Sequence, residues 1–180
     1  IPADYLLTPG AMGSYIQYVY MTPVFVDVRF GNWDQLLLYP KPDATQVYGN
    51  ILYHFGRGMA FTQKAKTEEA KIELQQLQHL MEDSSLLLPF TPFSSAIEGA
   101  IVAEGILSGT IALKEKNYNE AIEQFRLAVD AEENMVYNEP RDWMLNPKHY
   151  LGNAYIKAGK FDDAIKVLQK DLLNNNENGW

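Results

Sequence analysis

The strongest constraint on the fold is a glycine–alanine pair that recurs three times with the same separation. In each pair the glycine stands twelve residues before the alanine: Gly58 and Ala70, Gly109 and Ala121, Gly152 and Ala164. Glycine within a helix costs roughly 1 kcal/mol of helix propensity, so a recurring glycine indicates that a second helix approaches closely there. The alanine is expected on that facing helix, for the same reason. The pattern predicts repeated helix–turn–helix units.

Aromatic and leucine residues extend each unit. Tyr118 and Phe161 stand three residues before the second and third alanines, where they would open the second helix and cover the turn. Phe125 and Leu168 follow the same alanines by four residues and continue a buried helical stripe. Since 51 and then 43 residues separate the alanines, the connections between units are expected to differ in length.

The third copy resembles the tetratricopeptide repeat between about residues 145 and 178. The matching positions are Leu151, Gly152, Tyr155, Gly159, Phe161, Ala164 and Leu168. The copy departs from the family at Lys148, where a large aromatic is common, at Asp171, usually alanine, and at Asn176, where proline is expected. The family repeats every 34 residues, so this array is irregular.

Two further copies and one partial copy complete the array. The copy around Ala121 keeps five of the family's positions and the copy around Ala70 keeps four: Gly109, Tyr118, Ala121, Phe125 and Ala128, then Gly58, Phe61, Ala70 and Leu74. Near the start, residues 29–37 resemble a helix end, a glycine turn and an aromatic that opens a short helix. The preceding residues 15–28 have strand propensity, but helix is favoured because no partner strand is evident.

These observations predict an all-α fold. We expect antiparallel helix pairs stacked as a short, irregular right-handed superhelix, an α-solenoid. The expected units in a single domain of residues 1–180 are 15–42, 46–83, 97–134 and 145–178. A looser resemblance, carried by residues 29–34, 54–58 and 139–143, is to the C-terminal region of large bacterial tetratricopeptide-repeat proteins of unassigned function. It implies a fragment of a longer chain.

Composition and motifs argue against several classes of function. The 15 basic and 23 acidic residues give a net charge of −8, which disfavours nucleic-acid binding. The chain has no cysteine, its three histidines form no ligand pair, and no phosphate-binding loop or nucleophile elbow occurs. We therefore expect no metal, no cofactor and no catalytic residues. No apolar run reaches about 18 residues, so no membrane span is expected, and nothing selects a compartment.

The resemblance implies a binding surface. In the family the first helix of each repeat lines a concave groove that holds a protein or peptide. Mapped onto this chain, the groove residues are Phe55, Met59, Ile106, Thr110, Lys114, His149, Asn153 and Lys157. Some relatives hold a peptide carboxylate with lysine and asparagine, which Asn153 and Lys157 resemble in part. Alternatively, the apolar end of this surface packs on residues 15–28 or on upstream chain.

A second candidate site lies in the insertion before the last unit. Residues 139–143 combine Glu139, Arg141 and Trp143 in a connection outside the repeat pattern, and loops often carry function. A packing role is favoured, because Trp143 would fill the gap between units. The predicted function is a protein- or peptide-binding scaffold module that has no catalytic residues. The alternatives are an accessory part of an enzyme and a structural module that docks other domains of the same chain.

Overall fold

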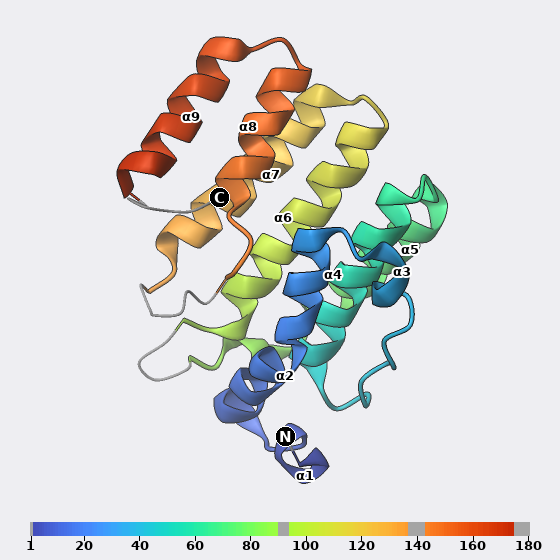
Figure 1. Ribbon diagram of the computed structural model, residues 1–180. Helices are drawn as coiled ribbons and strands as arrows, with labels where there is room; N and C mark the ends of the chain where they lie inside the picture. Colours follow the sequence, from blue (N-terminus) through green and yellow to red (C-terminus); the bar gives the residue numbers. More distant parts are fainter. Residues whose placement is uncertain (1, 90–93, 137–142, 175–180) are drawn as a thin grey trace.

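The computed structural model describes residues 2–89, 94–136 and 143–174. Within these ranges the chain forms helices and no β-strand, and the helices pack as adjacent pairs (Figure 1). The α-helices are α1 (Ala3–Leu6), α2 (Gly10–Phe30), α3 (Trp33–Leu36), α4 (Val47–Gln63), α5 (Thr67–Leu80), α6 (Ala96–Lys114), α7 (Tyr118–Asn134), α8 (Pro147–Lys157) and α9 (Phe161–Asn174). The all-α prediction is confirmed, and so is the choice of helix over strand for residues 15–28.

The same tight turn occurs four times. Its central residue has a left-handed backbone: Gly31, Ala65, Lys116 and Gly159, with φ of 71°, 58°, 63° and 74°. The next amide N–H donates to the carbonyl oxygen five residues before it, at 2.9 Å in each turn, which closes a Schellman-type helix end. The expected glycine turn within residues 29–37 is present, although α2 begins earlier than expected. The division into four units stays a prediction.

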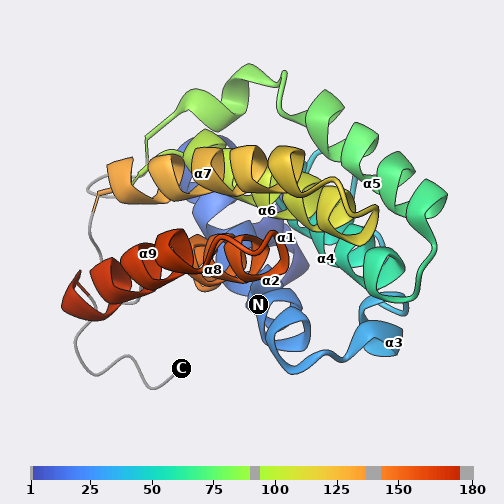
Figure 2. The same cartoon turned by 90° about the horizontal axis from the view of Figure 1, so that it is seen from above.

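The helices form two layers on a curve. Figure 2 shows α5, α7 and α9 on its outer side, with α4, α6 and α8 on the inner side and α2 against them. Asp27 in α2 accepts hydrogen bonds from Asn32 at 2.8 Å and from Tyr39 at 2.7 Å. Gln17 links α2 to α4 by accepting from the amide of Gly49 at 3.0 Å. These polar contacts attach α2 firmly to the array.

The close approach of helices agrees with the prediction at two of the three glycines. A Cβ added to Gly109 or Gly152 would lie 2.6 Å or 2.8 Å from the side chain of Phe125 or Leu168, each four residues beyond the paired alanine. Gly58 instead faces Leu107 in the next unit, at 2.5 Å. The helix that carries the paired alanine therefore faces Gly109 and Gly152 as expected, and the prediction is wrong for Gly58. Large side chains fill the space beside these glycines.

The insertion residue Trp143 belongs to the core. Its ring lies edge-on to Phe25 of α2 and Phe55 of α4, with centroids 4.8 Å and 5.5 Å away. The other interrupting segment also packs on the body, because a short 3-10 turn, Ser84–Leu87, buries Leu86 completely. Both connections thus bring apolar side chains into the core from outside the helix pairs.

One helix, α6, is long and apolar enough to cross a membrane by length and composition alone. Two thirds of the apolar window, 67%, is buried inside the fold. Core helices of folded domains pass the same test. Because α6 packs against α4, α5, α7 and α8, its apolar composition serves this central position.

Candidate functional site

Three of the eight expected groove residues are core residues. Phe55, Met59 and Ile106 are fully buried, so they cannot line an open groove. The reason is that α2 occupies this end of the inner face, with the ring of Phe25 6.4 Å from that of Phe55. The apolar end of the expected groove is thus packed on residues 15–28, as the alternative interpretation proposed.

Four other expected residues meet at one cleft. Thr110, Lys114, Asn153 and Lys157 line a hollow of about 380 Å³ between the ends of α4 and α6, the start of α7, and α8. The other lining residues are Gln63, Leu113, Lys116, Tyr118, Phe125 and Tyr150. We call this hollow the basic cleft. Its volume falls within the usual range of ligand sites.

Local structure explains the mixed lining of the basic cleft. Lys114 ends α6, Lys157 ends α8, and Lys116 occupies the left-handed turn position between α6 and α7. Thr110 is buried, and its hydroxyl donates to the carbonyl of Ile106 at 2.6 Å. Aromatic rings lie between these polar groups, with the centroids of Phe125 and Tyr150 5.8 Å apart. Phe125 is fully buried, whereas Tyr118 and Tyr150 are partly exposed, so the lysines surround the rings of two tyrosines.

The lysines of the basic cleft have no counter-charge among the described residues. Within the described part of the chain, no carboxylate forms an ion pair with Lys114, Lys116 or Lys157. Other basic side chains are paired, for example Lys71 with Glu115 at 2.6 Å. The chain as a whole has a net charge of −8, which repels anions, but salt screens this repulsion beyond about 8–10 Å. The attraction of the cleft lysines therefore acts on an anion that is already close to them.

His149 does not share the basic cleft. It lines a neighbouring hollow of about 340 Å³ beside Arg29 and Asn146, and its Nε2 lies 3.0 Å from Oδ2 of Asp171. Tyr150 lines both hollows and separates them. Burial raises the pKa of Tyr150 to about 12, against the opposing charge of Arg29. The expected polar stripe from His149 to Lys157 is therefore divided.

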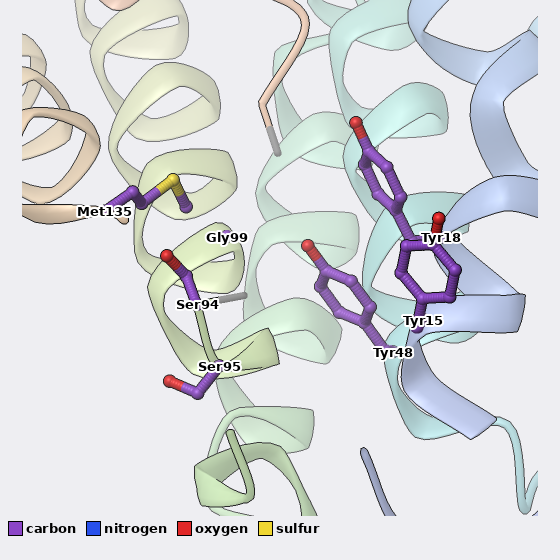
Figure 3. A pocket seen from close by; sticks show the side chains of 7 residues that line it. All are labelled: Tyr15, Tyr18, Tyr48, Ser94, Ser95, Gly99 and Met135. Carbon is purple, nitrogen blue, oxygen red and sulfur yellow. The ribbon is translucent and has the colours of Figure 1, made fainter. Parts of the chain in front are cut away.

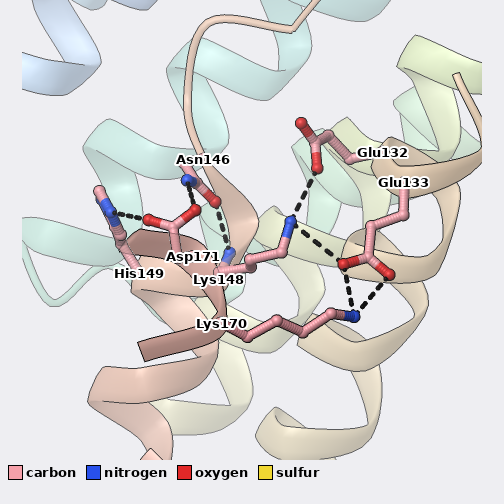
Figure 4. Close-up of polar contacts among 7 residues, drawn as sticks. All are labelled: Glu132, Glu133, Asn146, Lys148, His149, Lys170 and Asp171. Atoms are coloured by element: carbon pink, nitrogen blue, oxygen red, sulfur yellow. Dashed lines mark hydrogen bonds and ion pairs between the residues drawn. The ribbon is translucent and has the colours of Figure 1, made fainter. Parts of the chain in front are cut away.

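A buried polar cluster links α7, α8 and α9 (Figure 4). The Lys148 ammonium lies 3.2 Å from Glu132 and 3.4 Å from Glu133. On α9, Asp171 accepts from Asn146 at 2.7 Å. Lys148 and Asp171 are both buried, and both are positions where the chain departs from the family pattern. The two departures thus belong to one polar network.

The edge of this cluster carries a further charge. Lys170 lies 2.8 Å from Glu133, and its hydrogen bond is the main reason that the pKa of Glu133 is below its ordinary value. Lys148 adds to that effect. Ionised Glu133 therefore helps to hold α9 to α7 and α8. Lys148 and Lys170 pair with Glu132 and Glu133, and Asp171 accepts from Asn146, so the cluster works as a structural element.

A second buried carboxylate lies between α4 and α5. Glu73 is 2.6 Å from Nδ1 of His54 and accepts from Nε of Arg57 at 2.9 Å. Burial acts to raise the pKa of Glu73, but the hydrogen bonds from His54 and Arg57 outweigh it, so the pKa is lowered. Arg57 also donates to the carbonyl of Leu37 at 3.3 Å. The Glu73 carboxylate thus has hydrogen-bond partners within the fold, which indicates a structural role.

A third hollow among the described residues is too small for a ligand. Figure 3 shows a narrow space bordered by Tyr15, Tyr18 and Tyr48, with Ser94, Ser95, Gly99 and Met135 opposite. Its volume of about 10 Å³ fits about one water molecule. Among the described residues no group of three or more potential metal ligands gathers.

The second candidate site is described only in part. Glu139 and Arg141 lie outside the described residues. Trp143 is buried between α2 and α4, and its indole Nε1 has no hydrogen-bond partner among the described residues. Trp143 therefore packs as the favoured interpretation predicted, which leaves the basic cleft as the stronger candidate.

The fold is that of an α-helical repeat protein. A family model described as tetratricopeptide repeat matches residues 106–135, which cover the second half of α6, the turn at Lys116 and all of α7. The matched segment is similar to a single tetratricopeptide repeat and covers one helix pair of the chain. Comparison with curated proteins finds no match, and comparison with solved structures finds none. Tetratricopeptide repeats are generally protein-interaction modules without catalytic activity.

Sequence reasoning missed part of the cleft lining. Lys116, Tyr118, Phe125 and Tyr150 were not among the expected groove residues. Tyr118 and Phe125 stand at repeat positions that pack between helices, so their place beside the cleft had no separate signal. Lys116 could have been found from the sequence. It lies two residues before an aromatic that opens a helix, and therefore at the end of the expected turn.

Proposed function

We propose that the chain binds an acidic peptide segment of a protein partner in the basic cleft. The observation that carries the proposal is the meeting of Lys114, Lys116 and Lys157, without paired carboxylates among the described residues, around the partly exposed rings of two tyrosines. Carboxylates satisfy lysines through charge-assisted hydrogen bonds, while the rings contact the apolar parts of a peptide. Asn153 adds an amide that can bond a peptide backbone.

The buried half of the inner face supports a structural role alongside binding. Because α2 covers Phe55 and Met59, a peptide has only the end of the inner face near α8 to occupy. The proposed site is therefore short. At the other end of the inner face, the chain's own α2 occupies the surface on which another domain was the alternative expectation. A short site suits a peptide terminus or a few acidic residues.

A pair of matched probes tests the proposal. Fluorescence anisotropy would measure the affinity of an Asp/Glu-rich hexapeptide with a free C-terminal carboxylate and of the same peptide with an amidated end. Each lysine contact at an exposed cleft should contribute about 1 kcal/mol. We therefore expect the Lys114→Ala/Lys157→Ala variant to bind about 30-fold more weakly than wild type, with affinity falling as salt rises.

The control removes the same charge elsewhere. Lys41→Ala/Lys160→Ala deletes two exposed lysines that do not line the basic cleft, and its affinity should stay within about twofold of wild type. Equal weakening by both double variants would mean that overall charge governs binding, and the cleft would lose its role. Absence of binding by either peptide would reject the acidic ligand class. A pull-down with the full-length protein and the cleft variant would then identify the natural partner.

A further inference from the structure

The last helix presents an apolar face that nothing in the described chain covers. Phe161, Ile165 and Leu172 of α9 are 61%, 52% and 61% exposed. Their spacing of four and seven residues places them on one side of the helix. A contiguous face of large apolar side chains is unusual on a surface without a binding role.

The turns give the register of this face. Ile165 and Leu172 follow the left-handed residue of their turn by six and thirteen residues, and Ile122 and Val129 follow Lys116 by the same numbers. Ile122 and Val129 are 5% and 7% exposed, because they lie in one buried cluster with Leu151 of α8. These positions on α7 therefore contact the first helix of the following unit.

The preceding unit uses the same two positions in the same way. Six and thirteen residues after Ala65 stand Lys71 and Gln78 of α5. Lys71 pairs with Glu115 at 2.6 Å, and Gln78 donates to Glu104 of α6 at 2.8 Å. Both units thus use this register to contact the next unit. On α9 the register carries apolar side chains that remain exposed.

The other end of the array carries the surface on which a preceding unit would pack. Glu104 and Glu115 stand twelve residues and one residue before their left-handed turn residue. The same positions in α2 are Val19 and Phe30, which are 42% and 70% exposed. Tyr20 and Pro23 are exposed on the same helix, whose only charged residues are the buried Asp27 and Arg29 in its last turn. This face of α2 is therefore also apolar and offers no like charge to α9.

We propose that copies of this chain associate head to tail, with the α9 face of one copy packed on the α2 face of the next. The contact would repeat the one that α7 makes with α8 inside each chain. Such an interface joins two different surfaces, so association is open-ended and forms chains of increasing length. The net charge of −8 opposes it, so raised salt strengthens it.

Sedimentation velocity with two complementary variants tests the proposal. Ile165→Asp/Leu172→Asp blocks the α9 face, and Val19→Asp/Phe30→Asp blocks the α2 face; circular dichroism checks that both stay folded. Wild type should increase in average mass with concentration, more so in 0.5 M than in 0.15 M salt, while each variant alone stays monomeric. Mixed, the two should form a 1:1 dimer and nothing larger, because each retains one intact face.

A matched control and two contrary outcomes complete the test. Leu127→Asp alters a side chain of α7 that is 52% exposed and outside both faces, so it should associate as wild type does. Wild type that remains monomeric at the highest concentration in both salts would overturn the proposal and leave the faces to a different partner. Association that persists in both double variants would also overturn it, because another surface would be responsible.

Discussion

Alanine at Gly105 would test a close approach of α6 to the backbone of α7. The added Cβ would lie 2.8 Å from the carbonyl oxygen of Gln124 and 2.9 Å from the Cβ of Ala128. Neither atom can turn away by a change of rotamer, because one is backbone and the other is bonded directly to it. To restore ordinary contacts, α7 would have to move by on the order of 0.5–1 Å.

The cost follows from two opposing effects. Overpacking of this kind destabilises by roughly 1–3 kcal/mol, while replacing glycine by alanine in a helix stabilises by up to about 1 kcal/mol. We expect Gly105→Ala to lower the free energy of unfolding by about 1–2 kcal/mol. The same substitution at Gly49 meets its nearest atoms at 3.5–3.7 Å, which is ordinary contact. Gly49→Ala should therefore be neutral or stabilising by up to about 1 kcal/mol.

Urea unfolding of wild type and both variants would measure the difference. We expect the midpoint to fall for Gly105→Ala and to hold or rise for Gly49→Ala, with the slope of the transition unchanged. The separation between the variants should be about 2 kcal/mol. If Gly105→Ala matches Gly49→Ala, then α6 and α7 do not approach as closely as described, and the packing of the central unit is wrong.

Three further perturbations test the turns and the buried charges. Ala65→Gly should stabilise by about 0.5–1 kcal/mol and Gly159→Ala should destabilise by about 1 kcal/mol, because a left-handed backbone favours glycine; thermal melts would show shifts of opposite sign. The lowered pKa of Glu73 means that its stabilisation is present above about pH 4.5 and is lost as pH falls through the folded pKa. Urea unfolding from pH 7 to pH 3 should therefore show a gap between wild type and Glu73→Gln that narrows on acidification, and a constant gap would contradict this. Lys148→Met should destabilise by roughly 3 kcal/mol, because it removes a buried cation that pairs with Glu132 and Glu133; an unchanged urea midpoint would mean that these pairs add nothing to stability.

The turns were the most predictable part of the fold. A glycine turn followed by an aromatic was expected within residues 29–37, and Gly31 and Trp33 occupy those positions. The reason is that a left-handed residue and a helix-opening side chain are local requirements, which single positions reveal. The distances between helices were less predictable, because Gly105 and Gly109 both lie on α6 and only the position of α7 distinguishes their roles.

The inner face could not be predicted for a different reason. Residues 15–28 are apolar nearly all round, so their sequence shows that they are buried but not which helix they contact. The family resemblance predicts an open groove. This prediction applies to a chain only when no additional helix lies on the inner face of the array. Large apolar residues such as Phe55 and Met59 occur both in apolar binding grooves and in protein cores, so their residue type does not distinguish the two. Their burial under α2 is decided by tertiary structure alone.

Departures from the family pattern were informative once they were considered together. Lys148 and Asp171 each replace a residue type that normally packs between helices, and each is buried here. A buried cation or carboxylate is tolerated only with compensating charges or hydrogen bonds, so such a substitution implies that its neighbours changed as well. Glu132 and Glu133 compensate Lys148, and Asn146 compensates Asp171. The cluster therefore fixes the angle at which α8 and α9 meet α7 by polar contacts, which require defined geometry, whereas apolar packing would tolerate small shifts. Lys148 and Lys157 lie on the same helix, α8, so contacts that hold α8 in place also hold the helix that brings Lys157 to the basic cleft.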